Sequence, residues 1–309
     1  DVERSRGLGD VYKRQFMDIV ICLAAKDYRI VKKVVRSCRE YLQKPSDSIF
    51  IITNKSNNFF FFEKWKKKNR VVLVDEDTLV DGLSFTSVKM MLEKHFRAGT
   101  HIYPGWYFQQ FLKMGFALST YAKSEYLIWD SDTIPLHKLT YKKNDKYLFT
   151  VKTENHHPYF YTLQNLLGFG KLYDRSFIAE HMPISTLVMR ELVDKISHSH
   201  VDGKTWVEKI INATSGCDEQ AFSEFETYGN YCVKYHSDLF ETRPLITMRT
   251  AGMLFGRGVN RNQLALLSRM GYDTASFEIR DMPSFPRNLF NWWERLVLRM
   301  YRDLGLVKK

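Results

Sequence analysis

The chain has 309 residues, is 44% hydrophobic and 15% aromatic, and carries a formal net charge of +11. This composition supports a large buried core and excludes an intrinsically disordered chain. No apolar run approaches about eighteen residues, which argues against a membrane-spanning helix. The basic charge favours a polyanionic partner or a membrane surface.

Residues 1–15 resemble the translation of a sequencing adapter, and we expect them to be a non-native tail. A short disordered basic tail is the alternative. This segment has four basic and three acidic residues, so the other 294 residues retain a net charge of +10. We expect the native start near Met17 or upstream of it, no signal peptide, and a cytoplasmic location. The four cysteines show no zinc-site or CxxC spacing, which predicts core thiols in a reducing compartment.

The first half of the chain alternates apolar strands with helices. Continuous apolar runs predict buried strands at 17–25, 48–54 and 71–77, and residues 29–42 follow a helical spacing. A predicted helix at 105–124 leads into the strand of "EYLIWDSD" (125–132). Apolar strands that alternate with helices indicate a mostly parallel sheet covered on both faces. We therefore predict an α/β, Rossmann-like fold.

The second half continues without a proline- or glycine-rich linker. We expect a strand at 146–153 that resumes the sheet and a helix at 184–196. The chain is then a single domain with two halves, at 16–136 and 137–284. Residues 285–309 follow as a separate C-terminal helix.

Polar residues follow each predicted strand of the first half, at 26–27, 53–54, 75–77 and 130–132. In parallel sheets the carboxyl ends of the strands form the edge at which ligands bind. Asp130 and Asp132 repel each other unless a cation lies between them, and Mg²⁺ or Mn²⁺ prefers such oxygen ligands. The cation would keep open positions for the oxygens of a diphosphate.

Three interpretations of "DSD" compete. It is a plain turn, or the motif of a dehalogenase-type phosphatase with Asp130 as nucleophile, or the DxD motif of a nucleotide-sugar glycosyltransferase of the GT-A fold. The motif follows about a hundred residues of α/β pattern, which favours the third.

Four ordered segments then carry a resemblance: "GWYFQQFLKMGFA", "YLIWDSDTIPL", "EHMPIS" and "FSEFETYGNY". Together they resemble a bacterial family of GT-A-type glycosyltransferases with W-x-x-Q-Q, D-x-D, H-M and SEYE-x-YGN signatures, found among capsule and lipopolysaccharide biosynthesis genes. The resemblance covers about 17–283 and departs at Phe225, where the family has tyrosine. It implies metal-dependent transfer of a sugar from a nucleotide sugar to a glycan or lipid-linked acceptor in surface polysaccharide biosynthesis. The half at 16–136 would then bind the nucleotide, and the half at 137–284 the acceptor.

Two alternatives to a transferase remain: the DxD-type phosphatase, and a non-catalytic module of the same fold that binds nucleotides or carbohydrates. A sugar nucleotidyltransferase is disfavoured, because the "LAAKDY" loop after the first strand lacks the glycine- and arginine-rich sequence that wraps a triphosphate.

The resemblance and the strand-end pattern together assign candidate roles. We expect the metal ligands to be Asp130, Asp132 and, as a third ligand, His236. The donor-binding candidates are Asp27, Gln109, Gln110, Trp129 and Ser131. The candidates for the base of an inverting reaction are Asp218, Glu219 and Glu224, and His181 would touch the acceptor or the donor sugar. The plainer alternatives are a turn aspartate at Asp27, a solvated helix face at the glutamines, an acidic helix start at 218–219 and a core histidine at His181.

Residues 285–309 predict a basic amphipathic helix with two tryptophans. Such a helix suits an anionic membrane surface, at the inner face of the cytoplasmic membrane. A closing helix packed on the domain is the alternative. No nucleic-acid-binding motif accompanies the basic charge, so we expect no nucleic-acid partner.

Overall fold

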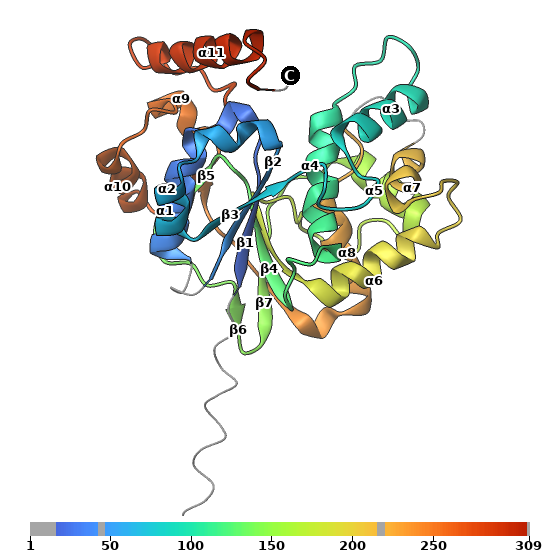
Figure 1. Ribbon diagram of the computed structural model, residues 1–309. Coiled ribbons are helices and arrows are strands. Elements are labelled where there is room, and N and C mark those ends of the chain that lie inside the picture. The colour runs from blue at the N-terminus through green and yellow to red at the C-terminus, as the bar shows by residue number, and fades with distance from the viewer. Residues whose placement is uncertain (1–16, 43–46, 215–219, 308–309) are drawn as a thin grey trace, which may run out of the picture.

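The computed structural model describes residues 17–42, 47–214 and 220–307 (Figure 1). Its centre is a five-stranded sheet in the order β3-β2-β1-β4-β8. These strands are β1 (Asp18–Cys22), β2 (Ile49–Thr53), β3 (Val71–Asp75), β4 (Glu125–Trp129) and β8 (His181–Ser185). The first four run parallel, and β8 pairs antiparallel with β4. The predicted α/β class with a mostly parallel sheet is confirmed.

Two smaller sheets flank the central one. The first has the order β10-β11-β5, formed by β10 (Thr247–Met248), β11 (Thr274–Ser276) and β5 (Thr133–Pro135). The second has the order β6-β7-β9, formed by β6 (Lys142–Lys143), β7 (Lys146–Thr150) and β9 (Phe240–Arg243).

The prediction that 146–153 resumes the central sheet is therefore wrong, because β7 lies in a separate sheet and β8 takes the last place. The segment "HMPIS" was not predicted as a strand, because it contains Pro183 and proline is rare in strands. Proline cannot donate to a sheet ladder, but an edge strand with one neighbour tolerates it. In the described part of the chain β8 pairs with β4 alone.

Alternate residues of the central strands pack into two separate cores. In β1, Ile19 and Ile21 face one core, and Val20 and Cys22 face the other. The first core contains apolar residues of α1 (Ile30–Tyr41), α9 (Ala251–Phe255), α10 (Arg261–Arg269) and α11 (Asn288–Asp303), with α2 (Glu63–Asn69) at its margin. The second contains residues of α3 (Phe85–His95), α4 (Pro104–Gly115), α5 (His157–Leu167), α6 (Thr186–Ser197), α7 (Trp206–Ala213) and α8 (Glu224–Tyr235).

Sequence periodicity explains most of these helices. The apolar residues of α1 recur on one face, at Ile30, Val31, Val34, Val35 and Cys38, and all five are fully buried. Helix α4 is shorter than predicted: it ends at Gly115, and a 3-10 turn at Phe116–Leu118 follows it. No helix in the described ranges is both long and apolar enough to cross a membrane.

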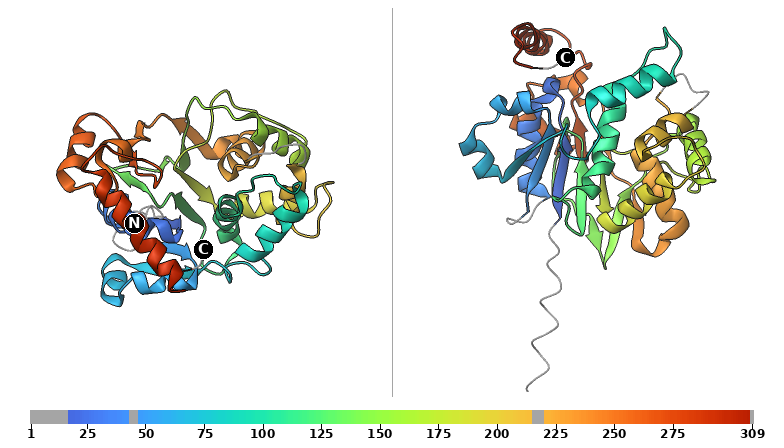
Figure 2. Two further views of the ribbon diagram at one scale, coloured as in Figure 1. Left: turned by 90° about the horizontal axis from the view of Figure 1, so that it is seen from above. Right: turned by 45° about the vertical axis from the view of Figure 1, so that its right-hand side comes forward.

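The strand order places a topological switch between β1 and β4. The chain moves from β1 outward to β2 and β3, then returns to the opposite side of β1 with β4. Ligands of open α/β sheets bind at such a switch, beyond the carboxyl ends of the strands. Figure 1 and the view from above in Figure 2 show α11 lying across this end of the sheet.

Candidate functional site

The loops after β1 and β4 meet beyond the carboxyl ends of these neighbouring strands. Asp27 ends a short 3-10 turn after β1, and Ser131 follows β4. The Ser131 hydroxyl donates to Asp27 Oδ2 at 3.2 Å, and both side chains are buried. Asp27 and the "DSD" segment therefore form one site, as their positions after the strands predict.

Asp130 is held by a buried lysine that the sequence did not single out. Its backbone N–H donates to the Glu180 carbonyl oxygen at 2.9 Å. Its Oδ1 lies 2.9 Å from Lys113 Nζ, and the same ammonium lies 2.7 Å from Glu224 Oε1. Burial alone would lower the pKa of Lys113, but the two carboxylates outweigh burial and raise it. Lys113 thus stays charged and joins α4, β4 and α8.

Asp132 carries the least compensated carboxylate of the site. It is partly exposed and makes no side-chain hydrogen bond or ion pair with the residues that the structure describes. Desolvation raises its pKa, and the negative charges of Asp27, Asp130 and Glu278 raise it further. Its backbone oxygen accepts from Phe277 N at 2.9 Å, which fixes the loop against β11.

This donor set fits a hard divalent cation. Asp132 lies among like charges, and carboxylate oxygens are the ligands that Mg²⁺ and Mn²⁺ prefer. Among the described residues, no group of three or more histidines, cysteines or acids is arranged as a complete metal cage. A cation at Asp130 and Asp132 would need its remaining ligands from water or from a bound molecule.

Arg257 is a second residue that sequence reasoning missed. It is fully buried, and its guanidinium lies 2.9 Å from Asp27 Oδ1 and 3.0 Å from Glu294 Oε2 of α11. It also donates to the carbonyl oxygens of Lys26 and Phe277, at 2.9 and 3.1 Å. Because Asp27 accepts from both Arg257 and Ser131, its carboxylate holds the two loops together.

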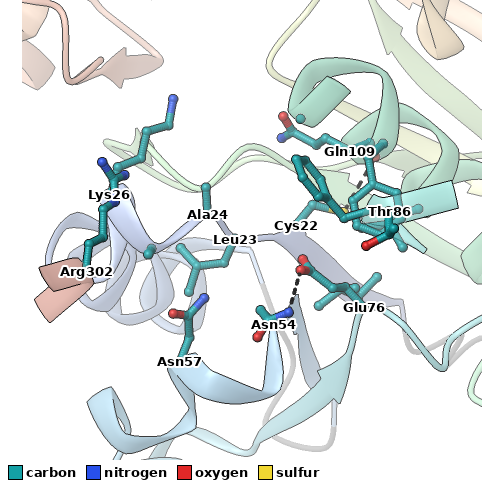
Figure 3. Close-up of a pocket in the computed structure, with 16 residues that line it drawn as sticks. Cys22, Leu23, Ala24, Lys26, Asn54, Asn57, Glu76, Thr86, Gln109 and Arg302 are labelled. Atoms are coloured by element: carbon teal, nitrogen blue, oxygen red, sulfur yellow. Dashed lines mark hydrogen bonds between the residues drawn. The ribbon is translucent and has the colours of Figure 1, made fainter. Parts of the chain in front are cut away.

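A cavity of about 530 Å³ lies beside these loops, at the ends of β1, β2 and β3 (Figure 3). Its lining includes Lys26, Asn54, Glu76, Thr86, Gln109 and Arg302. Asn54 Nδ2 donates to Glu76 Oε1 at 3.1 Å across part of this lining. The predicted donor-binding residue Gln109 lies in this cavity.

Gln110 differs from its neighbour Gln109. Its side chain is buried, and its Oε1 accepts from the Glu224 backbone N–H at 2.9 Å, at the first residue of α8. Consecutive residues of a helix point about 100° apart, so α4 directs Gln109 to the cavity and Gln110 to α8. The same helix carries Lys113 three residues later, on the same face as Gln110, so both side chains contact Glu224.

Trp129 and His181 lie in the core and not at the cavity. They are paired residues of β4 and β8, both fully buried, and their rings stack with centroids 4.8 Å apart. His181 Nε2 lies 2.9 Å from Thr150 Oγ1. Burial lowers the pKa of His181 to about 3, so the imidazole is neutral at physiological pH. His181 is thus a core histidine, as the plainer alternative expects, and its buried Nδ1 has no hydrogen-bond partner among the described residues.

The remaining predicted residues are not gathered at the strand ends. His236 Nε2 lies 3.0 Å from Glu191 Oε2, at the end of α8 opposite to Glu224. A helix of 12 residues separates the two ends by about 18 Å, so the structure does not bring His236 to Asp130. Glu224 does reach the site, through Lys113. Asp218 and Glu219 lie outside the described residues.

Comparison with solved structures returns glycosyltransferases at low identity. An active-site mutant of LgtC is 10% identical, covers 91% of this chain and 96% of its own, with a TM-score of 0.44. The apo form of mouse xyloside xylosyltransferase 1 is 11% identical and covers 87% of this chain and 99% of its own, also with a TM-score of 0.44. The bifunctional WbbM is 11% identical and covers 93% of this chain, with a TM-score of 0.41; this chain spans 53% of its length.

No curated protein matches this sequence. A family profile does, over residues 17–250, which is most of the chain. The chain belongs to DUF6492, a family of unknown function.

Proposed function

We propose that this protein is a metal-dependent glycosyltransferase of the GT-A type. The observation that carries the proposal is the junction at the β1–β4 switch. There the Asp132 carboxylate lies among like charges, and Lys26, whose positive charge acts on Asp132, lines a cavity of about 530 Å³ that can hold a nucleotide-sized ligand. The donor is a nucleotide sugar, and the acceptor is a glycan or a lipid-linked glycan of surface polysaccharide biosynthesis.

The chain's own residues divide the work. Asp130 and Asp132 would hold Mg²⁺ or Mn²⁺, which supplies the charge that stabilises a departing nucleoside diphosphate. Lys113 keeps the Asp130 carboxylate in place at 2.9 Å. Gln109 hydrogen-bonds the donor in the cavity, and Asp27 with Ser131 fixes the loop beside it.

An inverting reaction also needs a base for the acceptor hydroxyl. The candidates stay those of the acidic cluster, Asp218, Glu219 and Glu224. Glu224 is the described member, and Lys113 links it to Asp130. Glu224 is therefore linked through one ammonium to a carboxylate that we propose as a metal ligand.

We also propose that the protein works at the surface of the cytoplasmic membrane, where a lipid-linked acceptor resides. Helix α11 supports this, because its outward face exposes Trp292 and Trp293, which are 59% and 52% accessible. Arg287 at the N-cap of this helix and Arg295 within it are also exposed. Tryptophans beside arginines suit the headgroup region of an anionic bilayer.

The test is nucleoside diphosphate release from a panel of nucleotide sugars with Mn²⁺, measured by chromatography. We expect the parent protein to release diphosphate from at least one donor and to lose this activity with a chelator. D130N and D132N keep size but remove charge, so release should fall by a factor on the order of 10² or more, and Mn²⁺ binding measured by calorimetry should weaken. D145N, which removes an exposed aspartate at the β6–β7 turn, is the matched control.

The alternatives give different outcomes. A dehalogenase-type phosphatase would hydrolyse a simple ester such as p-nitrophenyl phosphate and would form an aspartyl-phosphate lost in D130N. A non-catalytic module would bind the donor without releasing diphosphate. Parent rates in both D130N and D132N would refute the proposed metal site.

A further inference from the structure

Two basic side chains from distant parts of the chain line the same end of the cavity. Lys26 follows β1, and Arg302 lies in the last turn of α11. In Figure 3 both lie on one side of the cavity, and Gln109 lies on the other. Within the described ranges, neither side chain takes part in a hydrogen bond or an ion pair. Two cations that lack a direct ion-pair partner at a cavity favour an anionic ligand.

Lys26 and the middle of α11 are fixed to one buried residue. Arg257 donates through Nη2 to the Lys26 carbonyl oxygen at 2.9 Å, and its Nε lies 3.0 Å from the Glu294 carboxylate. Glu294 is fully buried as well. The loop that carries Lys26 and the helix that carries Arg302 are thus held by the same guanidinium.

The far end of α11 is held by aromatic contacts. The ring of Tyr301 packs edge-on against the rings of Phe59 and Phe60, with centroids 5.5 and 5.7 Å apart. Phe60 is buried, and it ends the 3-10 turn (Lys55–Phe60) that carries Asn57 into the cavity lining. Arg302 follows Tyr301 directly, so it reaches the cavity only while α11 is docked.

The rest of the cavity has a different character. Its wall away from the two cations is apolar and includes Phe85, Phe108 and Leu112. Asn54 and Glu76 add hydrogen-bonding groups there. A cavity that is apolar with a few hydrogen-bonding groups at one end and cationic at the other suits a ligand of matching shape. Such a ligand has a flat polar ring and a sugar at one end and phosphates at the other. The cationic end also adjoins Asp132, whose charge Lys26 partly offsets.

We propose that Lys26 and Arg302 bind the phosphate groups of the nucleotide, so that α11 is part of the ligand site. This inference rests on the proposed function only for the choice of a nucleotide as ligand. It has a thermodynamic consequence: phosphate contacts made by Arg302 exist only with α11 docked, so nucleotide binding must stabilise the docked helix.

The test compares R302Q with R299Q, which removes the same charge from an exposed position of the same helix. Calorimetry first identifies which nucleoside diphosphate (ADP, CDP, GDP or UDP, with Mg²⁺) binds the parent protein. We expect R302Q to weaken the binding of that diphosphate about tenfold, which is the effect of one lost charge-assisted hydrogen bond. The affinity for the matching nucleoside should stay unchanged. K26Q should behave like R302Q, and R299Q like the parent.

Hydrogen exchange gives an independent readout. The diphosphate should slow amide exchange across 288–303 in the parent and in R299Q but not in R302Q. Equal diphosphate affinity in R302Q and the parent would overturn the inference, as would the absence of any nucleotide binding. If diphosphate binds as expected and no sugar is transferred, the inference stands and the proposed transferase activity fails.

Discussion

At the scale of single residues, Asp132 should make the protein's stability depend on pH. Its pKa is raised in the folded chain, first by desolvation and then by neighbouring acids. Such a group favours folding below about pH 4, where an unfolded aspartate titrates, and this contribution is lost as the pH rises through the raised pKa. The folded, metal-free protein should therefore be weakened near neutral pH by its own carboxylate.

We predict that D132N raises the melting temperature of the metal-free protein, and that the gain grows from pH 5 to pH 8. A gain of about 1 kcal/mol corresponds to roughly 2–4 °C in a domain of this size. Thermal unfolding followed by circular dichroism checks it, with D145N as the control. A gain in melting temperature that is constant over this pH range, or absent, would contradict the raised pKa of Asp132.

Lys113 presents the opposite case, a buried cation shared by two carboxylates. We predict that K113M lowers the free energy of unfolding by about 3–5 kcal/mol, because Asp130 and Glu224 are left without their counter-ion. Urea denaturation measures this. K89M is the matched control: it breaks the half-exposed pair of Lys89 with Glu93, at 3.6 Å, and should cost less than about 1 kcal/mol. Similar losses in the two variants would rule out the role given to Lys113.

At the scale of elements, α11 is packed in an unusual way. Its buried face carries Asn291, Glu294 and Leu298, while its tryptophans point outward. The helix packs on the domain, as the closing-helix alternative expects, and its other face presents an apolar, basic surface. Binding of that face to a membrane stays a prediction. Deleting it would leave Arg257 buried without Glu294, so truncation would destabilise the domain and cannot test membrane binding.

Substitutions on the outward face of α11 can test membrane binding without disturbing the core. We predict that the double variant W292S/W293S loses binding to vesicles of phosphatidylglycerol and phosphatidylcholine, while its unfolding transition stays at the parent position. Vesicle co-sedimentation provides the measurement. F62S, which removes an aromatic ring that is 76% exposed on another part of the surface, should bind like the parent. Retention of W292S/W293S on the vesicles would refute the membrane proposal.

At the scale of the whole molecule, sequence patterns within short segments predicted the strands of the first half and the edge at which their acids lie. The strands β1 to β4 are continuous apolar runs, and their parallel order puts Asp27 and Asp130 at one edge. The place of β7 depends on pairing partners that lie far away in the chain, and β8 is obscured by its proline. Neither is visible in a window of ten residues.

The candidate site divides in the same way. Asp130, Asp132 and Gln109 follow from motif and strand order. Arg257 does not, because a lone arginine in a loop gives no local signal that it will be buried against Asp27, 230 positions away. The sequence also offers no means to tell Gln109 from Gln110, since only the helix rotation in the folded chain separates them.

That separation of 230 positions has a consequence during synthesis. Ribosomes add about 5–20 residues per second, so Arg257 is made on the order of tens of seconds after Asp27. Throughout this interval the nascent β1–β4 region contains Asp27 without its guanidinium partner, and Lys26 without the hydrogen bond that holds its carbonyl. The edge that carries the acids must therefore stay hydrated while the sheet behind it forms. Its buried contacts are complete only when residues 257 to 294 have been made, so the candidate site forms later than the sheet that carries it.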